Sequence, residues 1–115
     1  MSDNETKVSD IRKLVSSFVN ERDWEQFHSP KNLSMSISIE SAELMEIFQW
    51  VSLDEATTKM KAGPVRENAV DEIADILIYS IAFCNYNNID ITEAIKQKMI
   101  KNIKKYPSED FKGKI

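Results

Sequence analysis

Two short segments, residues 39–44 and 71–76, each place a pair of carboxylates three residues apart within an apolar run. The pairs are Glu40 with Glu43, and Glu72 with Asp75. On a helix, residues with this spacing share one face. An unpaired carboxylate is costly to remove from water, and a coordinated cation offsets that cost. Four acids on two helices therefore predict a metal site.

The expected ligands are all oxygen atoms, with no His or Cys beside them. Such a ligand set selects a hard divalent cation, Mg²⁺, with Mn²⁺ as a substitute, rather than Zn²⁺. Mg²⁺ is commonly shared between carboxylates and the phosphates of a substrate. It lowers the pKa of a bound water, and a spare carboxylate could then orient or deprotonate a water for attack on phosphorus. We therefore expect a nucleoside di- or triphosphate as the ligand.

Two alternatives use the same residue types. The acids could be solvated helix surface or partners of Lys and Arg, because charged residues usually lie outside. Glu46 and Asp71 are expected to project further round and are weaker candidates. Glu25 and His28 have the E-x-x-H spacing of di-iron carboxylate bundles, but those sites need two such motifs and His28 is the chain's only His. His28 could equally be a capped surface residue.

Composition limits the classes of protein. The chain has 115 residues, of which 42% are hydrophobic, and its net charge is -4. We expect one domain over residues 1–115, with a core of about 8–107, and neither a nucleic-acid surface nor a polybasic membrane patch. The lone Cys84 cannot form an internal disulfide, and we expect it to be a small buried hydrophobe. With no apolar run of spanning length we expect a soluble protein, and the lone cysteine indicates a reducing, cytoplasmic compartment.

The spacing of apolar residues, with only two Gly and three Pro, predicts an all-α fold. The expected helices cover residues 6–24 with a continuation or restart over 21–28, then 30–51, 64–86 and 91–105, with a short helix within 52–63 and a loose tail over 108–115. Four principal helices with short links predict a four-helix-bundle-like domain. Because the third long helix has apolar residues on two sides, we expect a homodimer or homotetramer to cover it.

The helical period also predicts which way the acids face. At about 100° per residue, the first pair forms a stripe with Ile47 and Trp50 beside the apolar side of its helix. The second pair lies with Tyr79 opposite a stripe that includes Val70, Ile73 and Leu77. We expect both acid faces to be covered.

Four blocks of the sequence resemble the MazG-like all-α nucleoside triphosphate pyrophosphohydrolases, and the dCTP pyrophosphatase branch most of all. The blocks occur in the same order and span about Val8 to Pro107. They are residues 22–33 with Trp-Glu-Gln-Phe-His, residues 39–50 with the first acid pair and Phe-Gln-Trp, residues 71–79 with the second acid pair, and residues 98–107 ending in Lys-Tyr-Pro.

This resemblance implies hydrolysis of a nucleoside triphosphate, such as dCTP or a modified dCTP, to the monophosphate and pyrophosphate. It implies an oligomer whose active site is built from neighbouring helices, and Mg²⁺ held by Glu40, Glu43, Glu72 and Asp75, the catalytic acids. It further implies a substrate site in which His28, Trp24, Trp50 and Tyr79 surround the base and sugar, with Lys98, Asn102 and Tyr106 near the sugar-phosphate end.

Two residue choices bear on how the base would be bound. Indoles stack well on bases, but Trp24 could instead pack into the core. Relatives often carry Gly beside the first acids, where this chain has Ile39 and Ala42. That difference bears on the base preference rather than on the reaction. The alternative function is a non-catalytic helical module that binds a metal or a partner protein.

Overall fold

The computed structural model describes residues 1–115 and contains only helices, which confirms the predicted all-α class. None of them is long and apolar enough to cross a membrane. In chain order, the elements are α1 (Val8–Glu21), the 3₁₀ turn η1 (Glu25–Phe27), α2 (Pro30–Phe48), α3 (Leu53–Lys59), α4 (Pro64–Tyr86), α5 (Ile91–Lys105) and α6 (Ser108–Phe111).

Local signals fix where most helices begin. The side chains of Ser29, Ser52 and Asp90 each accept a hydrogen bond from the backbone N–H three residues on, at 3.0, 3.2 and 2.8 Å. These bonds satisfy donors that a helix start leaves free. Before α4, Gly63 adopts φ +96° and Pro64 takes the first helical position. The predicted starts of α2, α3, α4 and α5 are therefore confirmed.

Helix α1 ends at Glu21, earlier than the predicted Trp24, because the chain turns into a left-handed residue. Asp23 has φ +53°, and the Trp24 N–H donates back to the Val19 carbonyl at 3.0 Å. This is the Schellman arrangement, in which a left-handed residue lets the chain satisfy the last carbonyls of a helix. A Gly at this position would have indicated the end of the helix, but the residue is Asp23. The apolar periodicity alone therefore predicted a helix that is too long.

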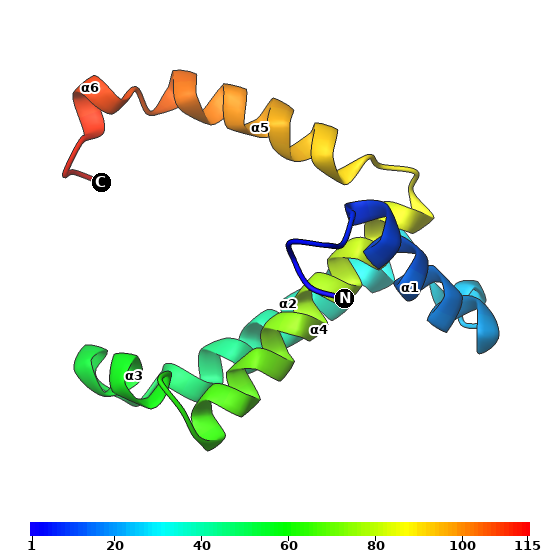
Figure 1. Ribbon diagram of the computed structural model, residues 1–115, viewed down its shortest axis with the longest axis horizontal. Coiled ribbons are helices and arrows are strands. Elements are labelled where there is room, and N and C mark those ends of the chain that lie inside the picture. Colours follow the sequence, from blue (N-terminus) through cyan, green and yellow to red (C-terminus); the bar gives the residue numbers. More distant parts are fainter.

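The longest helices, α2 and α4, lie side by side and antiparallel, and α1 packs against α4 (Figure 1). Val15 of α1, Leu33 of α2 and Ala82 of α4 form the buried core where the three meet, and Leu33 is 2% exposed. Tyr79, Ile81 and Phe83 pack around them. The acid-bearing face of α4 is thus its inner face.

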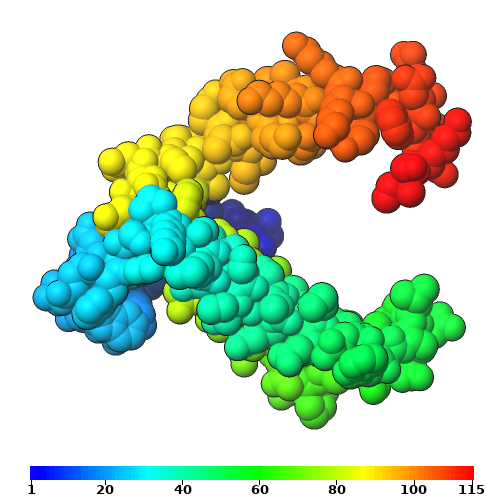
Figure 2. Space-filling model, turned by 180° about the vertical axis from the view of Figure 1, so that it is seen from behind, coloured from blue at the N-terminus to red at the C-terminus, as the bar shows by residue number.

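Helix α5 departs from the other helices instead of closing a bundle within one chain. It runs away from the corner where α1 meets the end of α4, so that the molecule has the outline of an open bracket (Figures 1 and 2). Only four residues of 115 are buried. The stripe of Val70, Ile73 and Leu77 on α4 is exposed. A single chain therefore leaves apolar faces uncovered that sequence patterning assigns to an interior.

The tail after Pro107 is not loose, contrary to expectation. It forms the short helix α6, and Phe111 contacts Tyr106 edge to face with ring centroids 5.3 Å apart. An aromatic contact that close stabilises the turn of the chain. The tail was expected to be loose because most of its residues are polar, and that composition gives no indication of the contact between Tyr106 and Phe111.

Candidate functional site

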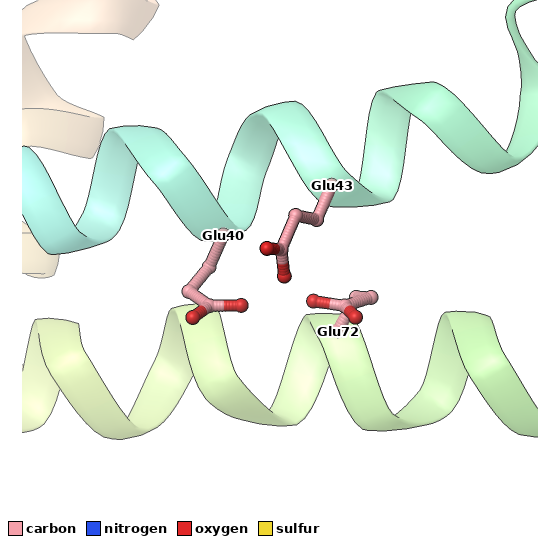
Figure 3. Close-up of side chains that lie close together, drawn as sticks. All are labelled: Glu40, Glu43 and Glu72. Carbon is pink, nitrogen blue, oxygen red and sulfur yellow. The ribbon is translucent and has the colours of Figure 1, made fainter.

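Three of the four predicted acids converge across the contact between α2 and α4. Carboxylate oxygens of Glu40, Glu43 and Glu72 all lie within 4.8 Å of one another. Figure 3 shows the three carboxylates pointing toward one another, two from α2 and one from α4. Glu40 and Glu72 are half-buried, and Glu43 lies at the exposed rim. The antiparallel pairing of the helices brings the two motifs to the same level.

Glu40 and Glu72 each have one oxygen that is buried and without a hydrogen-bond partner. No protein cation offsets their charge, because the one ion pair of the chain, Arg22 with Glu21 at 3.6 Å, lies elsewhere. Buried acceptors without partners are rare in folded proteins and call for a ligand or a proton. A hard cation fits this all-oxygen donor set.

The electrostatics of the cluster favour a shared proton when no cation is bound. Burial, the close approach of the Glu72 and Glu43 carboxyls, and the charges of Glu43 and Asp75 together raise the pKa of Glu40 from 4.5 to about 7. For Glu72, the close contact with the Glu40 carboxyl lowers the pKa, but burial and the Glu43 and Asp75 carboxyls outweigh it, so the pKa of Glu72 is also raised. Carboxylates this close cannot all ionise freely.

Asp75 lies outside the group of three but close enough for its charge to act on Glu40 and Glu72. Two further polar side chains border the site: Asn68, which sequence reasoning missed, and Glu46, which it named only as a weaker candidate. Glu43 and Glu72 line an open depression together with Glu46, Ile47 and Asn68. Asn68 precedes Glu72 by one helical turn, and Glu46 follows Glu43 by three residues, so the shared face was the available signal.

His28 lies in a different place, half-buried beside a cavity of about 130 Å³ at the junction of α1, η1 and α4. Its ring is 6.5 Å from that of Tyr86, edge to face. Glu25 and Asn85 line the same cavity, so the E-x-x-H pair borders this cavity and is not part of the acid cluster. Tyr79 packs against the core cluster between the two regions.

The remaining predicted substrate residues lie at the surface of the single chain. Trp24 stands edge to face with Phe18 at 5.6 Å and is 46% exposed, so it is not a core residue. Trp50 follows the end of α2 and is 89% exposed, which contradicts its expected place beside the apolar side. On α5, Lys98 is exposed and Asn102 half-buried, and Tyr106 follows the helix. One chain does not gather these residues around the acids.

The fold and the site together define an all-α protein with an acidic centre between two antiparallel helices. The model of the MazG-like family matches residues 35–114, a segment that includes all four predicted acids. The chain belongs to the MazG-like family.

Named relatives agree with that assignment. The chain is 41% identical to dCTP pyrophosphatase 1 of Mus musculus, over 95% of this chain and 64% of that protein, and 38% identical to dCTP pyrophosphatase 1 of Homo sapiens, over 90% and 61%. It therefore spans less than two thirds of the length of these relatives. A crystal structure of a pyrophosphatase from Archaeoglobus fulgidus superposes with a TM-score of 0.82 at 40% identity, over 93% of this chain and 98% of that one.

Proposed function

We propose that this protein is a Mg²⁺-dependent nucleoside triphosphate pyrophosphohydrolase. The observation that carries the proposal is the pair of buried carboxylate oxygens of Glu40 and Glu72, which have no partner in the protein. Membership of the MazG-like family and the names of the pyrophosphatase relatives support it. A cytoplasmic location, expected from the single unpaired Cys84, is part of the same proposal.

Glu40, Glu43 and Glu72 would hold the cation, and Asp75 would complete the set. When bound, Mg²⁺ draws negative charge from phosphate oxygens and acidifies a coordinated water. Mn²⁺ has the same preference for oxygen and would substitute for it. Until a cation arrives, the shared proton keeps the buried acids from repelling one another.

The chain's own acids would then serve the hydrolysis of the triphosphate. A carboxylate of the set that is free of the cation orients a water and accepts its proton, while the water oxygen forms a bond to phosphorus. The bond between that phosphorus and the oxygen that bridges the α and β phosphates breaks, and the products are a monophosphate and pyrophosphate. Exposed Glu43, at the rim, is the acid that solvent reaches most readily.

We place the base near the aromatic residues and His28, and the phosphates near the acids. The cavity beside His28 offers apolar walls from Val15 and Val19 and polar atoms from Asn20 and His28, a combination suited to a base. A deoxycytidine triphosphate or a modified form of it is the proposed substrate, by likeness to the dCTP pyrophosphatases. Lys98, Asn102 and Tyr106 of the α5 region would meet its sugar and phosphates.

We further propose that the working enzyme is a homo-oligomer. In one chain, α5 runs away from the helices that carry the acids, Trp50 is almost fully exposed, and the stripe of Val70, Ile73 and Leu77 is exposed. A second copy packed on these faces would cover the stripe and bring aromatic and basic residues to the acids of its neighbour. The site would then be shared between subunits.

A panel of ribo- and deoxynucleoside triphosphates, assayed with Mg²⁺ and with EDTA, tests the proposed reaction. We expect pyrophosphate release with Mg²⁺ only, and the fastest release from a cytosine deoxynucleotide. Absence of pyrophosphate from every member would end the proposal. Calorimetric titration with Mg²⁺ and with nucleotides then identifies the alternative, because a non-catalytic module would bind its ligand and leave the triphosphates intact.

The substitution Glu43→Gln tests the acid cluster itself. It removes one charge at the rim and keeps the shape of the side chain, so we expect turnover to fall by about 10²-fold or more while the helical circular dichroism is unchanged. Asp71→Asn is the matched control, since Asp71 is an exposed acid directly before Glu72. Equal activity of the two variants would remove Glu43 from the site.

A further inference from the structure

Helix α5 carries Lys98 and Asn102, and Tyr106 follows it directly, yet the helix has little packing to hold it in place. Substantial helix contacts are limited to α2 with α4 and α1 with α4. The apolar side chains of Ile95, Met99 and Ile103 on α5 are exposed. The direction of α5 within its own chain therefore depends on residues 87–90, the short connection from α4.

The side chain of Arg12, on α1, forms hydrogen bonds with this connection and with the last turn of α4. The guanidinium of Arg12, on α1, donates to the Asn85 side-chain oxygen at 2.9 Å, to the Ile89 carbonyl at 2.6 Å and to the Cys84 carbonyl at 3.4 Å. The Asn85 amide donates in return to the Arg12 carbonyl at 3.1 Å. We call these contacts the Arg12 clamp.

The clamp holds the two residues that close the end of α4. The Ile89 N–H donates to the Cys84 carbonyl at 2.9 Å, and Asn88 between them is left-handed, with φ +54°. This is again a Schellman ending. A guanidinium at the carboxyl end of a helix also meets the negative end of the helix dipole. Asp90 caps α5 directly after Ile89, so the clamp fixes the backbone from which α5 starts.

We propose that Arg12 is a positioning residue that aims α5, and with it Lys98 and Asn102, at the phosphates of the substrate. This inference rests on the proposed function, because it assigns Arg12 a part in substrate binding through α5. Arg12 contacts the C-terminal end of α4, whereas Glu72 and Asp75 lie nearer the middle of that helix. Arg12 therefore acts by positioning α5 and does not touch the substrate. Its planar fork suits the task, since it reaches three oxygens on the chain at once.

The substitution Arg12→Ala removes the clamp, and Lys13→Ala is the matched control, an exposed cation next in the chain. We expect Arg12→Ala to raise the KM for the triphosphate about tenfold, as for the loss of one hydrogen bond to a charged group, with kcat changed by less than about twofold. The proposal would be overturned if kcat fell by as large a factor as KM rose. It would also be overturned if Arg12→Ala changed KM no more than Lys13→Ala does. If Arg12→Ala does not fold, the same criteria apply to Arg12→Lys, which keeps the charge and the stem but loses the fork.

A second comparison shows whether Arg12 acts through α5. In a background that carries both Lys98→Ala and Asn102→Ala, Arg12→Ala should raise KM by less than about twofold further, because the residues that it positions are already missing. Full additivity would contradict the proposal.

Hydrogen exchange tests the clamp without any assay of activity. The amides of residues 91–95 should exchange faster in Arg12→Ala than in Lys13→Ala, and those within α2 at the same rate. An inactive wild-type protein with this exchange pattern would refute the proposed function and retain the clamp. Unchanged exchange over residues 91–95 would refute the clamp.

Discussion

Glu40 and Glu72 present the same buried oxygens to a proton and to a cation. Burial and the neighbouring acids raise the pKa of Glu40 to about 7, and no Lys or Arg pairs with either Glu40 or Glu72. A site of this kind therefore holds its proton near neutral pH until a divalent cation displaces it. Binding of the metal and release of the proton should be coupled.

The raised pKa of Glu40 makes the stability of the metal-free protein depend on pH. The unfolded state loses its proton near pH 4.5 and the folded state near pH 7, so the folded state binds more protons between these values. The contribution of Glu40 to the free energy of unfolding should be greatest below pH 4.5, decrease as the pH rises to about 7, and then stay constant. Urea unfolding in EDTA over this range measures the slope.

Glu40→Gln isolates this contribution, since it keeps the shape and cannot ionise. We expect its free energy of unfolding to depend on pH less steeply than that of the wild type between pH 4.5 and 7. Added Mg²⁺ should stabilise the wild type most above pH 7, where it meets ionised acids. Parallel pH profiles for the two proteins would contradict the assigned pKa.

The spacing of the acids was sufficient to predict that each pair shares a helix face, and the structure places Glu40, Glu43 and Glu72 together. Sequence alone could not rank them, because which oxygen is innermost depends on the register between α2 and α4. The same register brings Asn68 to the site. Trp50 was misplaced because α2 ends at Phe48, and periodicity applies only within the helix.

The starts of the helices followed from single residues, whereas some ends did not. Three helix starts could be predicted from the capping residues Ser29, Ser52 and Asp90, because a side-chain oxygen must accept from the free backbone N–H groups there. Helix α1 instead ends through Asp23 in a left-handed conformation, where Gly would be the usual signal. The direction of α5 depends on the Arg12 clamp, which joins residues more than seventy positions apart.

Asn88 at the end of α4 offers a test at the scale of the element. Its φ of +54° penalises a residue with a β carbon, and Asn tolerates it better than Ala does. We expect Asn88→Ala to lower the free energy of unfolding and Asn88→Gly to keep or raise it, with about 1 kcal/mol between the two variants. Urea midpoints at one protein concentration measure the difference. If the Ala variant were as stable as the Gly variant, residue 88 would not have the left-handed backbone conformation.

The whole molecule exposes more surface than a compact chain of its size. Its accessible surface is 9289 Å², against roughly 6,500 Å² for a folded monomer of this mass. Its radius of gyration is 17.1 Å, against about 13 Å. The excess of roughly 2,800 Å² per chain has the size of an obligate interface. Sequence patterning assigns both sides of α4 to an interior, which supports the proposal that a second copy of the chain covers the exposed side.

The substitution Leu77→Lys tests this cover. Leu77 lies on the exposed stripe of α4 with Val70 and Ile73, so a charge there would be buried without a partner in an oligomer and harmless in a monomer. The control Glu67→Lys puts the same side chain at an exposed position of the same helix. Light scattering during size-exclusion chromatography should give a multiple of 13.3 kDa for the wild type and the control, and a smaller assembly for Leu77→Lys. A wild-type mass of 13.3 kDa at all concentrations would show that the open chain is the working form, and the site would then have to function without residues from a neighbour.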